Sequence, residues 1–439
     1  MASASALDRS ALDWRRVSAL GIAIAISGNF AGWNYGLAVG GWRAMVIAAL
    51  AMALLFFVLA QCLAELAAAF PGGAGFDHYV RKGFGPAAGY VCGLSLGVGL
   101  AVGTGLAGSF AYAYFGTLVG VDAWLAKFAM FVIVIGLQLR GAREVAGLTV
   151  LTGTVVVTVL GAFYLFTAPH FSYTNLAPHG GTTDQATLAS ILGCVPYALF
   201  LFLGVEQAAQ AAAETGDPSR TMPKALGSAV LVVAVIGLAT LFFATGSAGV
   251  DRLSASDDPL FTAITSNSAS SAAHLMTQIV SVGALVALTG TFFSLAYAAS
   301  RQFFHLARAG DMPKLFATTN KNHAPWGALV VTGLCGLVST SFQPKAVMVV
   351  FIFLVCISYL LVLGSFMRLR YSQPGLSRPY RAPGGSALSV VGICLVIAVA
   401  VSCYRTQPAV LNWCLAGLAL SLMHHMVRSH RRNSSCSGP

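Results

Sequence analysis

The chain has 439 residues, of which 57% are hydrophobic and only 9% are charged. Water-soluble domains carry about 25% charged residues, so the composition excludes an ordinary soluble protein. The formal net charge of +11 would suit a nucleic-acid partner, but the basic residues lie in short stretches between apolar runs. We therefore expect that the protein does not bind nucleic acid. We expect it to lie in a lipid bilayer.

Apolar runs of the length that a membrane helix needs, about 20 residues, follow one another along the chain. We expect an all-α polytopic membrane protein in which residues 17–427 form one domain between the tails 1–16 and 428–439. The twelve predicted spans are 17–37, 44–69, 87–117, 121–139, 147–168, 188–212, 225–246, 273–304, 326–342, 346–367, 386–404 and 408–427.

The basic residues assign the two sides of the membrane. With twelve spans, 20 Lys and Arg residues fall in the tails and in the loops on the same side as the tails. The opposite side carries five, which are Arg43, Lys127, Arg252, Lys345 and Arg405. Because Lys and Arg are enriched in cytoplasmic loops, we predict a multi-pass protein of the cell membrane with both termini in the cytoplasm.

The nine cysteines do not suggest a metal site or disulfides. Eight of them lie inside apolar runs, and none belongs to a close-spaced ligand pattern. Buried free cysteine behaves as a small hydrophobic residue. We expect no metal and no cofactor, and no cluster of residues suggests an enzyme.

Two of the predicted spans are interrupted by glycine and polar residues. The first is broken at Ser27–Asn29 and again at Gly32–Asn34, and the sixth has Gly204 beside the lone carboxylate of Glu206. Gly-interrupted helices in matching positions of two halves indicate a transporter binding site. Irregular backbone at membrane depth survives only where it is buried in protein or lines a cavity.

Glycine also serves as a packing residue in membrane helices, and Ser27–Gly28 alone fits packing better than a site. The polar residues that accompany the two breaks, Asn29, Asn34 and Glu206, favour a binding site. An ionisable residue inside the membrane is costly and tends to mark a functional pathway.

Four segments resemble motifs of the amino acid–polyamine–organocation permeases, in the right order and over nearly the whole chain. The break at Ser27–Phe30 resembles that family's Gly-Ser-Gly-aliphatic-Phe. The stretch 70–90 resembles its Phe-Pro-x-x-Gly-Gly loop. Residues 202–225 (FLGVEQAAQAAAETGDPSRTMPKA) and 300–316 (SRQFFHLARAGDMPKLF) resemble its motifs at the sixth and eighth helices.

This resemblance implies two inverted five-helix repeats, at about 17–168 and 188–367, plus two extra helices. It implies a secondary active transporter that works by alternating access around broken helices 1 and 6. The segment 26–41 (ISGNFAGWNYGLAVGG) is most similar to ethanolamine permeases. We therefore expect import of a small organic amine such as ethanolamine. The alternative is an amino acid permease or exchanger of the same fold.

Two departures from the family pattern bear on substrate and coupling. Ile26 and Asn29 replace a glycine and an aliphatic residue at the first break, which would suit a substrate without a carboxylate. The fifth span has no lysine at 148–166, where some proton-coupled relatives carry one. A proton stays a possible coupling ion. Sodium is less favoured, because hydroxyls such as that of Thr291 in the eighth span usually bond backbone rather than bind an ion.

The resemblance also implies which residues surround the substrate. Its amine should meet backbone carbonyls, because half-helix C-termini carry partial negative charge. Trp33 and Phe202 would cover an ammonium group by cation–π contact, although Trp33 fits packing equally well, and Asn29 and Asn34 would bind a hydroxyl. The predicted carbonyls are those of Ile26, Ser27, Gly28, Phe202, Leu203 and Gly204.

Glu206 has three interpretations at this point. It carries a coupling proton or controls the conformation, it bonds the unwound backbone, or it pairs directly with a cationic substrate. Relatives with zwitterionic substrates share this Glu, which argues against direct pairing as the default. Glu214 is a candidate for the inner gate together with Asp217 and nearby basic residues; the alternative is that these charges, like Glu65, are merely solvated.

Overall fold

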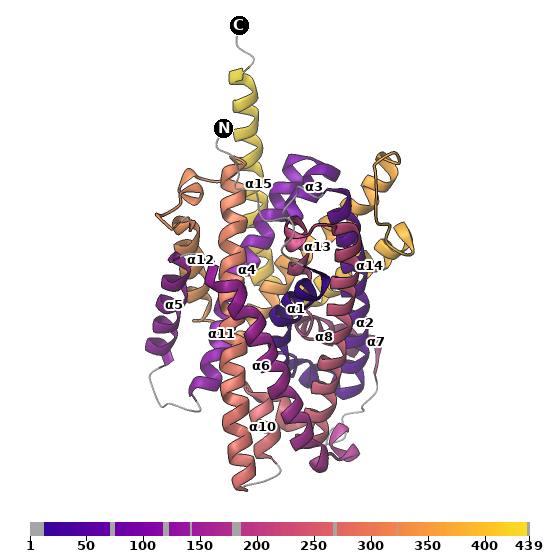
Figure 1. Cartoon of the computed structure of the whole chain (residues 1–439), viewed down its shortest axis with the longest axis vertical. Coiled ribbons are helices and arrows are strands. Elements are labelled where there is room, and N and C mark those ends of the chain that lie inside the picture. Colours follow the sequence, from indigo (N-terminus) through magenta and orange to yellow (C-terminus); the bar gives the residue numbers. More distant parts are fainter. Residues whose placement is uncertain are drawn as a thin grey trace.

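A computed structural model describes residues 13–70, 75–116, 123–140, 143–177, 186–266, 270–322 and 324–436. Every regular element in these ranges is a helix (Figure 1). Residues 1–12 and 437–439 of the predicted tails and residues 71–74 of the predicted Phe-Pro-x-x-Gly-Gly motif lie outside these ranges.

The helices follow the apolar runs, since a backbone in lipid must satisfy its hydrogen bonds internally. In chain order they are α1 (Trp14–Ala25), η1 (Ile26–Asn29), α2 (Tyr35–Ala69), α3 (Phe76–Phe84), α4 (Pro86–Gly116), α5 (Ala123–Leu139), α6 (Arg143–Thr167), η2 (Ala168–His170), η3 (Tyr173–Leu176), α7 (Leu188–Phe200), η4 (Val205–Glu214), α8 (Pro218–Ala248), α9 (Val250–Ser254), α10 (Pro259–Thr265), α11 (Ser271–Arg308), η5 (Lys314–Ala317), α12 (Trp326–Ser339), α13 (Pro344–Ser372), α14 (Gly385–Thr406) and α15 (Pro408–Cys436).

Eight helices in the described ranges are long and apolar enough to cross a membrane. Three shorter apolar helices, at Trp124–Leu139, Leu188–Phe200 and Trp326–Ser339, accompany them. The eight are Tyr35–Ala69, Pro86–Gly116, Thr152–His170, Pro218–Ala248, Ser271–Arg308, Pro344–Ser372, Gly385–Thr406 and Pro408–Arg428. In its described ranges the chain is therefore all-helical, with the apolar helices of a multi-pass membrane protein.

Both interruptions that the sequence predicts are present. The segment predicted as the first span consists of α1, the short 3₁₀ helix η1 and the first turns of α2, and the segment predicted as the sixth consists of α7 and η4. The expected loop between the first two spans is replaced by a kink within α2 at Gly41, where φ is 70°. Glycine adopts this left-handed conformation without the steric penalty that a Cβ atom brings.

The helices pack in two groups, and the two breaks lie where the groups meet. In one group α2 packs against α7 and α8, and α1 packs against α8. In the other, α4 packs against α11, α12 and α13. Figure 1 shows α11 running along most of the length of the molecule.

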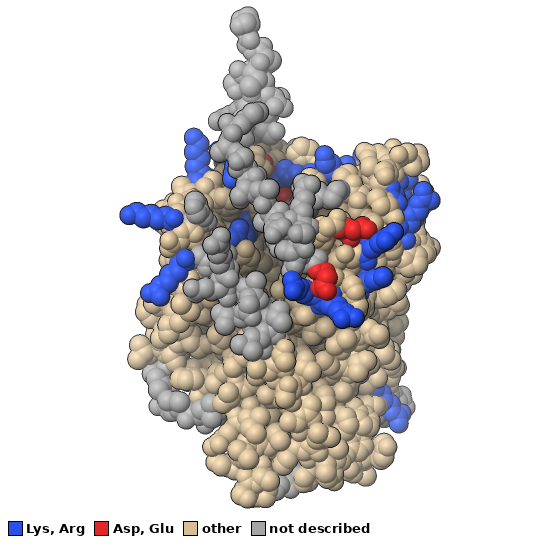
Figure 2. Space-filling model, viewed as in Figure 1, with Lys and Arg blue, Asp and Glu red and all other residues tan. Residues whose placement is uncertain are grey.

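Lys and Arg gather toward one end of the molecule. In the face that Figure 2 shows, they occupy the upper half, and the lower end is nearly free of charged side chains. Figure 1 shows α15 ending at this same upper end. This distribution agrees with the sidedness that the loops suggest.

Close packing of α4 depends on glycine. A Cβ atom added at Gly105 would overlap both the carbonyl oxygen of Gly336 and the hydroxyl of Ser339 in α12. Small residues allow membrane helices to approach through their backbones. Gly105 therefore sets the distance between α4 and α12.

Replacement of Gly105 by Val should separate α4 from α12 and lower stability by at least the 1–3 kcal/mol or so that overpacking costs. Thermal unfolding in detergent measures the change. Gly136→Val on α5 is the matched control, since no described atom lies within 4 Å of a Cβ there. Equal unfolding temperatures for the two variants would contradict the assigned role.

Candidate functional site

The first break is held in shape by its own polar side chains. The amide of Asn29 donates to the carbonyl of Ile26 at 2.9 Å, and the indole N–H of Trp33 donates to the carbonyl of Asn29 at 2.9 Å. Thr240 of α8 donates to Oδ1 of Asn29 at 2.9 Å. These bonds replace part of the helical ladder that the break interrupts.

Asn34 joins the break to the segment on the side away from the basic loops. Its Oδ1 accepts the N–H of Gly32 at 3.1 Å. Its Nδ2 donates to the carbonyl of Leu253 in α9 at 2.9 Å and to that of Ser256, between α9 and α10, at 2.7 Å. Next to it, the hydroxyl of Tyr35 donates to Asp257 at 2.8 Å.

The second break depends on Gly204, whose φ is 106°. A Cβ atom there would also lie 2.6 Å from Cγ2 of Ile24 in α1, so both conformation and space require glycine. The two breaks touch directly, because a Cβ atom at Gly28 would lie 2.5 Å from the carbonyl oxygen of Phe200.

Glu206 lies at the start of η4 and is only 2% exposed. Its Oε2 accepts the N–H of Gly204 at 2.9 Å, and its Oε1 accepts Nε2 of Gln207 at 2.8 Å. The buried hydroxyl of Tyr359 in α13 lies beside it. The carboxylate therefore stabilises the unwound backbone and at the same time reaches the pocket.

A pocket lies at the meeting point of the two breaks. Its walls come from both breaks and from the facing helices α4, α11 and α13, and they are mostly apolar. None of the described lining residues is Lys, Arg or His, and Glu206 is the single acidic residue among them. The lining consists of Ile24, Ser27, Gly28, Leu100, Gly103, Ala107, Phe110, Phe200, Leu203, Gly204, Glu206, Gln207, Leu288, Thr291, Leu295, Phe351 and Val355.

Five of the predicted substrate-binding and coupling residues line this pocket, and five others are not among its lining residues. Ser27, Gly28, Leu203, Gly204 and Glu206 are in the lining. The side chains of the other five are buried and make protein contacts instead; these residues are Ile26, Asn29, Trp33, Asn34 and Phe202.

The aromatic ring at the pocket differs from the one that the sequence predicts. Phe202 stacks on Phe56 of α2, with 5.7 Å between the ring centroids. Phe200, two residues earlier, lines the pocket and meets Phe110 edge-on at 6.0 Å. Phe200, Leu203, Gly204 and Gln207 follow the spacing of one helical face through the turn at 201–204, and Phe202 lies off that face.

Sequence reasoning missed the walls that α4, α11 and α13 provide. Apart from Thr291, which donates to Ser27 Oγ at 2.6 Å, these residues are apolar or glycine. Phe110, Leu288 and Phe351 have no feature in the sequence that separates them from ordinary packing residues. We expected from the sequence that the hydroxyl of Thr291 would bond backbone; in the structure it bonds the side chain of Ser27 at the break instead.

The side chain of Glu214 lies outside the described part of the structure, so its predicted gating role stays a prediction. Asp217 is the N-cap of α8, and its carboxylate accepts the N–H and the hydroxyl of Ser219. These bonds, with the nearby Arg220, hold the pKa of the exposed Asp217 below its ordinary value. Its described contacts are those of a helix cap.

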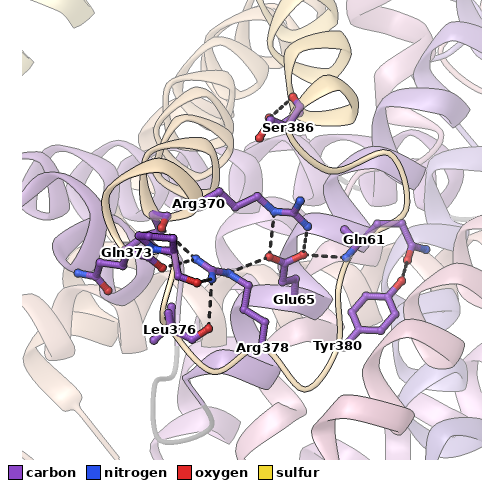
Figure 3. Close-up of polar contacts among 12 residues, drawn as sticks. Gln61, Glu65, Arg370, Gln373, Leu376, Arg378, Tyr380 and Ser386 are labelled. Carbon is purple, nitrogen blue, oxygen red and sulfur yellow. Dashed lines mark hydrogen bonds and ion pairs between the residues drawn. The ribbon is translucent and has the colours of Figure 1, made fainter.

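Glu65 is not a solvated rim residue, contrary to the sequence interpretation. Its side chain is 2% exposed and lies between the guanidinium groups of Arg370 and Arg378 (Figure 3). The partners are more than 300 residues apart in sequence, and no local pattern indicates the pairing.

A broken-helix pocket within an all-helical, multi-pass protein is the arrangement of membrane carriers. A sequence model of the family described as "Amino acid permease" matches residues 12–418. The chain therefore belongs to the amino acid permease family, within the amino acid–polyamine–organocation superfamily. This family consists of membrane permeases rather than enzymes.

Individual relatives cover most of the chain at low identity. A probable GABA permease of Pseudomonas aeruginosa is 26% identical over 394 residues, which are 85% of this chain and 80% of the relative. A histidine permease of Saccharomyces cerevisiae is 26% identical over 82% of this chain and 63% of its own length. An L-asparagine permease of Streptomyces coelicolor is 24% identical over 81% of this chain and 77% of its own length.

Replacement of Asn34 by Ala should lower stability while leaving the apparent KM for uptake unchanged. The substitution leaves the N–H of Gly32 and two carbonyls of the α9–α10 segment without their partner, and each buried unsatisfied group costs about 1–3 kcal/mol. Thermal unfolding and uptake kinetics measure the two effects. Asn412→Ala, at an exposed bond to Tyr404, is the control. A raised KM without a loss of stability would contradict this role and indicate that Asn34 contacts the substrate.

Proposed function

We propose that this chain is a secondary active transporter that imports a small amino acid or a small organic amine by alternating access. The observation that carries the proposal is the pocket where both breaks meet, with one carboxylate and no basic side chain among its described lining residues. Such a pocket attracts a cationic amine, and its apolar walls accept the rest of a small solute.

The proposed topology has twelve membrane spans with both termini in the cytoplasm of a cell-membrane protein. Two repeats, at about 17–168 and 188–367, each begin with a broken helix, and two further helices follow. The matching breaks at 26–34 and 201–204 support the repeats. The gathering of Lys and Arg at one end supports the orientation.

Two substrates remain candidates within this function. The proposal of ethanolamine as the substrate rests on the similarity of the segment 26–41 to ethanolamine permeases. An amino acid is supported by the relatives, whose names include GABA, histidine and L-asparagine. It is also favoured because Asn29 and Asn34, which were expected to bind the hydroxyl of ethanolamine, already bond protein groups. We place the amino acid first.

Uptake by proteoliposomes separates the two substrates. We expect labelled GABA, L-asparagine or histidine to accumulate, with excess unlabelled amino acid competing and ethanolamine competing weakly. The physical reason is that Asn29 and Asn34, the amides expected to bind ethanolamine's hydroxyl, bond protein groups instead. Full competition by ethanolamine together with no uptake of amino acids would reverse the order of the candidates. If no amine and no amino acid is taken up, the proposed transport function is wrong.

For Glu206 we propose a coupling role, in which its carboxyl group takes up and releases a proton during transport. Its burial and the absence of a basic partner in the described pocket lining fit a group whose charge changes during the cycle. Sodium stays the less favoured coupling ion, because the hydroxyl of Ser294 bonds the backbone of its own helix, as hydroxyls in membrane helices usually do.

Replacement of Glu206 by Gln should remove the pH dependence of uptake, since an amide cannot carry the proton but retains an oxygen for the N–H of Gly204. Uptake rates measured across the pH range in which the unsubstituted carrier changes test this. Asp217→Asn is the control, because it alters an exposed carboxylate beyond the same short helix. An unaltered pH profile in the Gln variant would remove Glu206 from the proton path.

A further inference from the structure

A row of three hydrogen-bonded side chains connects the first break to α8 and α6. Oδ1 of Asn29 accepts the hydroxyl of Thr240 in α8 at 2.9 Å, and the hydroxyl of Tyr164 in α6 lies 2.6 Å from that of Thr240. Asn29 and Thr240 are completely buried. None of the three is among the residues that line the pocket. We call Asn29, Thr240 and Tyr164 the support network.

At one end of the support network, Asn29 closes a turn of the first break. Its Nδ2 donates to the carbonyl of Ile26 at 2.9 Å, across the two residues Ser27 and Gly28. Both of these residues line the pocket. Because Nδ2 must face the Ile26 carbonyl, the orientation of the amide is fixed, and its oxygen faces Thr240. Thr240 is therefore the donor in that bond.

The other two members share too few hydrogen atoms for all the acceptors around them. Thr240 and Tyr164 carry one hydroxyl hydrogen each, and the carbonyl of Ile236 lies 3.0 Å from both hydroxyls. A helical threonine tends to bond the carbonyl four residues earlier, which for Thr240 is this one. When Tyr164 donates to Ile236 instead, the hydrogen of Thr240 is available to Asn29. Tyr164 thus directs Thr240 toward the break.

The turn that Asn29 closes has little room to shift. A Cβ atom at Gly28 would lie 2.5 Å from the carbonyl oxygen of Phe200, so the two breaks are in backbone contact there. A displaced turn therefore changes the pocket wall. When only a fraction of the molecules has the binding-competent wall, the apparent affinity for a solute falls by that fraction. Any group that holds the turn in place raises the affinity without contacting the solute.

We propose that Thr240 and Tyr164 are positioning residues that set the substrate affinity of this transporter by holding Asn29, and with it the turn at Ser27 and Gly28. This inference rests on the proposed transport function. An aliphatic side chain, which the family pattern has in place of Asn29, cannot accept a hydrogen bond. The support network is therefore a feature of chains that carry a polar residue at this position.

Three substitutions grade the support network. Thr240→Val removes the hydroxyl, Tyr164→Phe removes only the phenolic oxygen, and Thr240→Ser keeps a donor. The KM for uptake into proteoliposomes is measured with labelled GABA, L-asparagine or histidine, whichever is transported. We expect Thr240→Val to raise KM by roughly 2- to 12-fold, the range that one neutral hydrogen bond supports. Tyr164→Phe should raise it less, Thr240→Ser should leave it nearly unchanged, and all three should keep the uptake rate at saturation.

Thr245→Val is the matched control on the same helix. Thr245 is also completely buried, but its hydroxyl has no hydrogen-bond partner in the described part of the structure. We expect this variant to keep the KM of the unsubstituted protein. An equal rise in KM for Thr240→Val and Thr245→Val would show a general loosening of α8 and would overturn the proposal.

A double-mutant cycle tests whether Thr240 acts through Asn29. Substitutions at two members of one hydrogen-bond network are not additive. We therefore expect Asn29→Leu with Thr240→Val to raise KM no further than Asn29→Leu alone. Additive effects of the two substitutions would mean that Thr240 acts by another route, and the positioning role would be wrong.

Hydrogen–deuterium exchange of the segment 26–34 gives a readout that does not depend on transport. We expect faster exchange there in Thr240→Val than in Thr245→Val, because the turn loses a support. Equal exchange in the two variants would contradict the proposal, and so would faster exchange with an unchanged KM. If the unsubstituted protein takes up no amine and no amino acid, the transport function is wrong, and the exchange rates alone decide whether the support network holds the break.

Discussion

The constraint on which the rest of this structure depends is that a bilayer offers no hydrogen bonds to an interrupted backbone. Two helices stop at membrane depth, and each break must be satisfied by protein groups. Asn29 and Asn34 provide amide groups at the first break, and the carboxylate of Glu206 provides an acceptor at the second. These side chains satisfy backbone groups that the breaks leave without helical partners. The breaks are therefore stable, and the pocket forms beside them where the two helix groups meet.

The elements of the fold follow from the sequence because hydropathy and glycine act locally. Apolar runs predict the helices, and Gly28 and Gly204 mark the interruptions, since only glycine fits the close approach and the positive φ found there. The kink at Gly41 was not expected, because a pair of glycines between two apolar runs fits a loop as well as a bend.

Only part of the site can be predicted from hydropathy and glycine positions in the sequence. Polar residues near the breaks attract attention, yet the bonds of Asn34 reach Leu253 and Ser256, more than 200 residues away. Phe110 and Phe351 look like packing residues until helices from the second group are placed beside the breaks. Pairings such as Glu65 with Arg370 depend on tertiary contacts that a single sequence does not contain.

The side chains that hold the first break are largely separate from those that form the pocket walls. Asn29, Trp33 and Asn34 are not among the lining residues, whereas the wall positions Gly103, Leu288 and Phe351 have no polar side chain that could bond the break. The helices α4 and α11 reach the break through other residues, Tyr114 and Thr291. Changes in the walls therefore leave the hydrogen bonds of that break intact. A scaffold of this kind can diverge in substrate preference by single apolar replacements, so close relatives are free to carry different solutes while the interrupted helices stay the same.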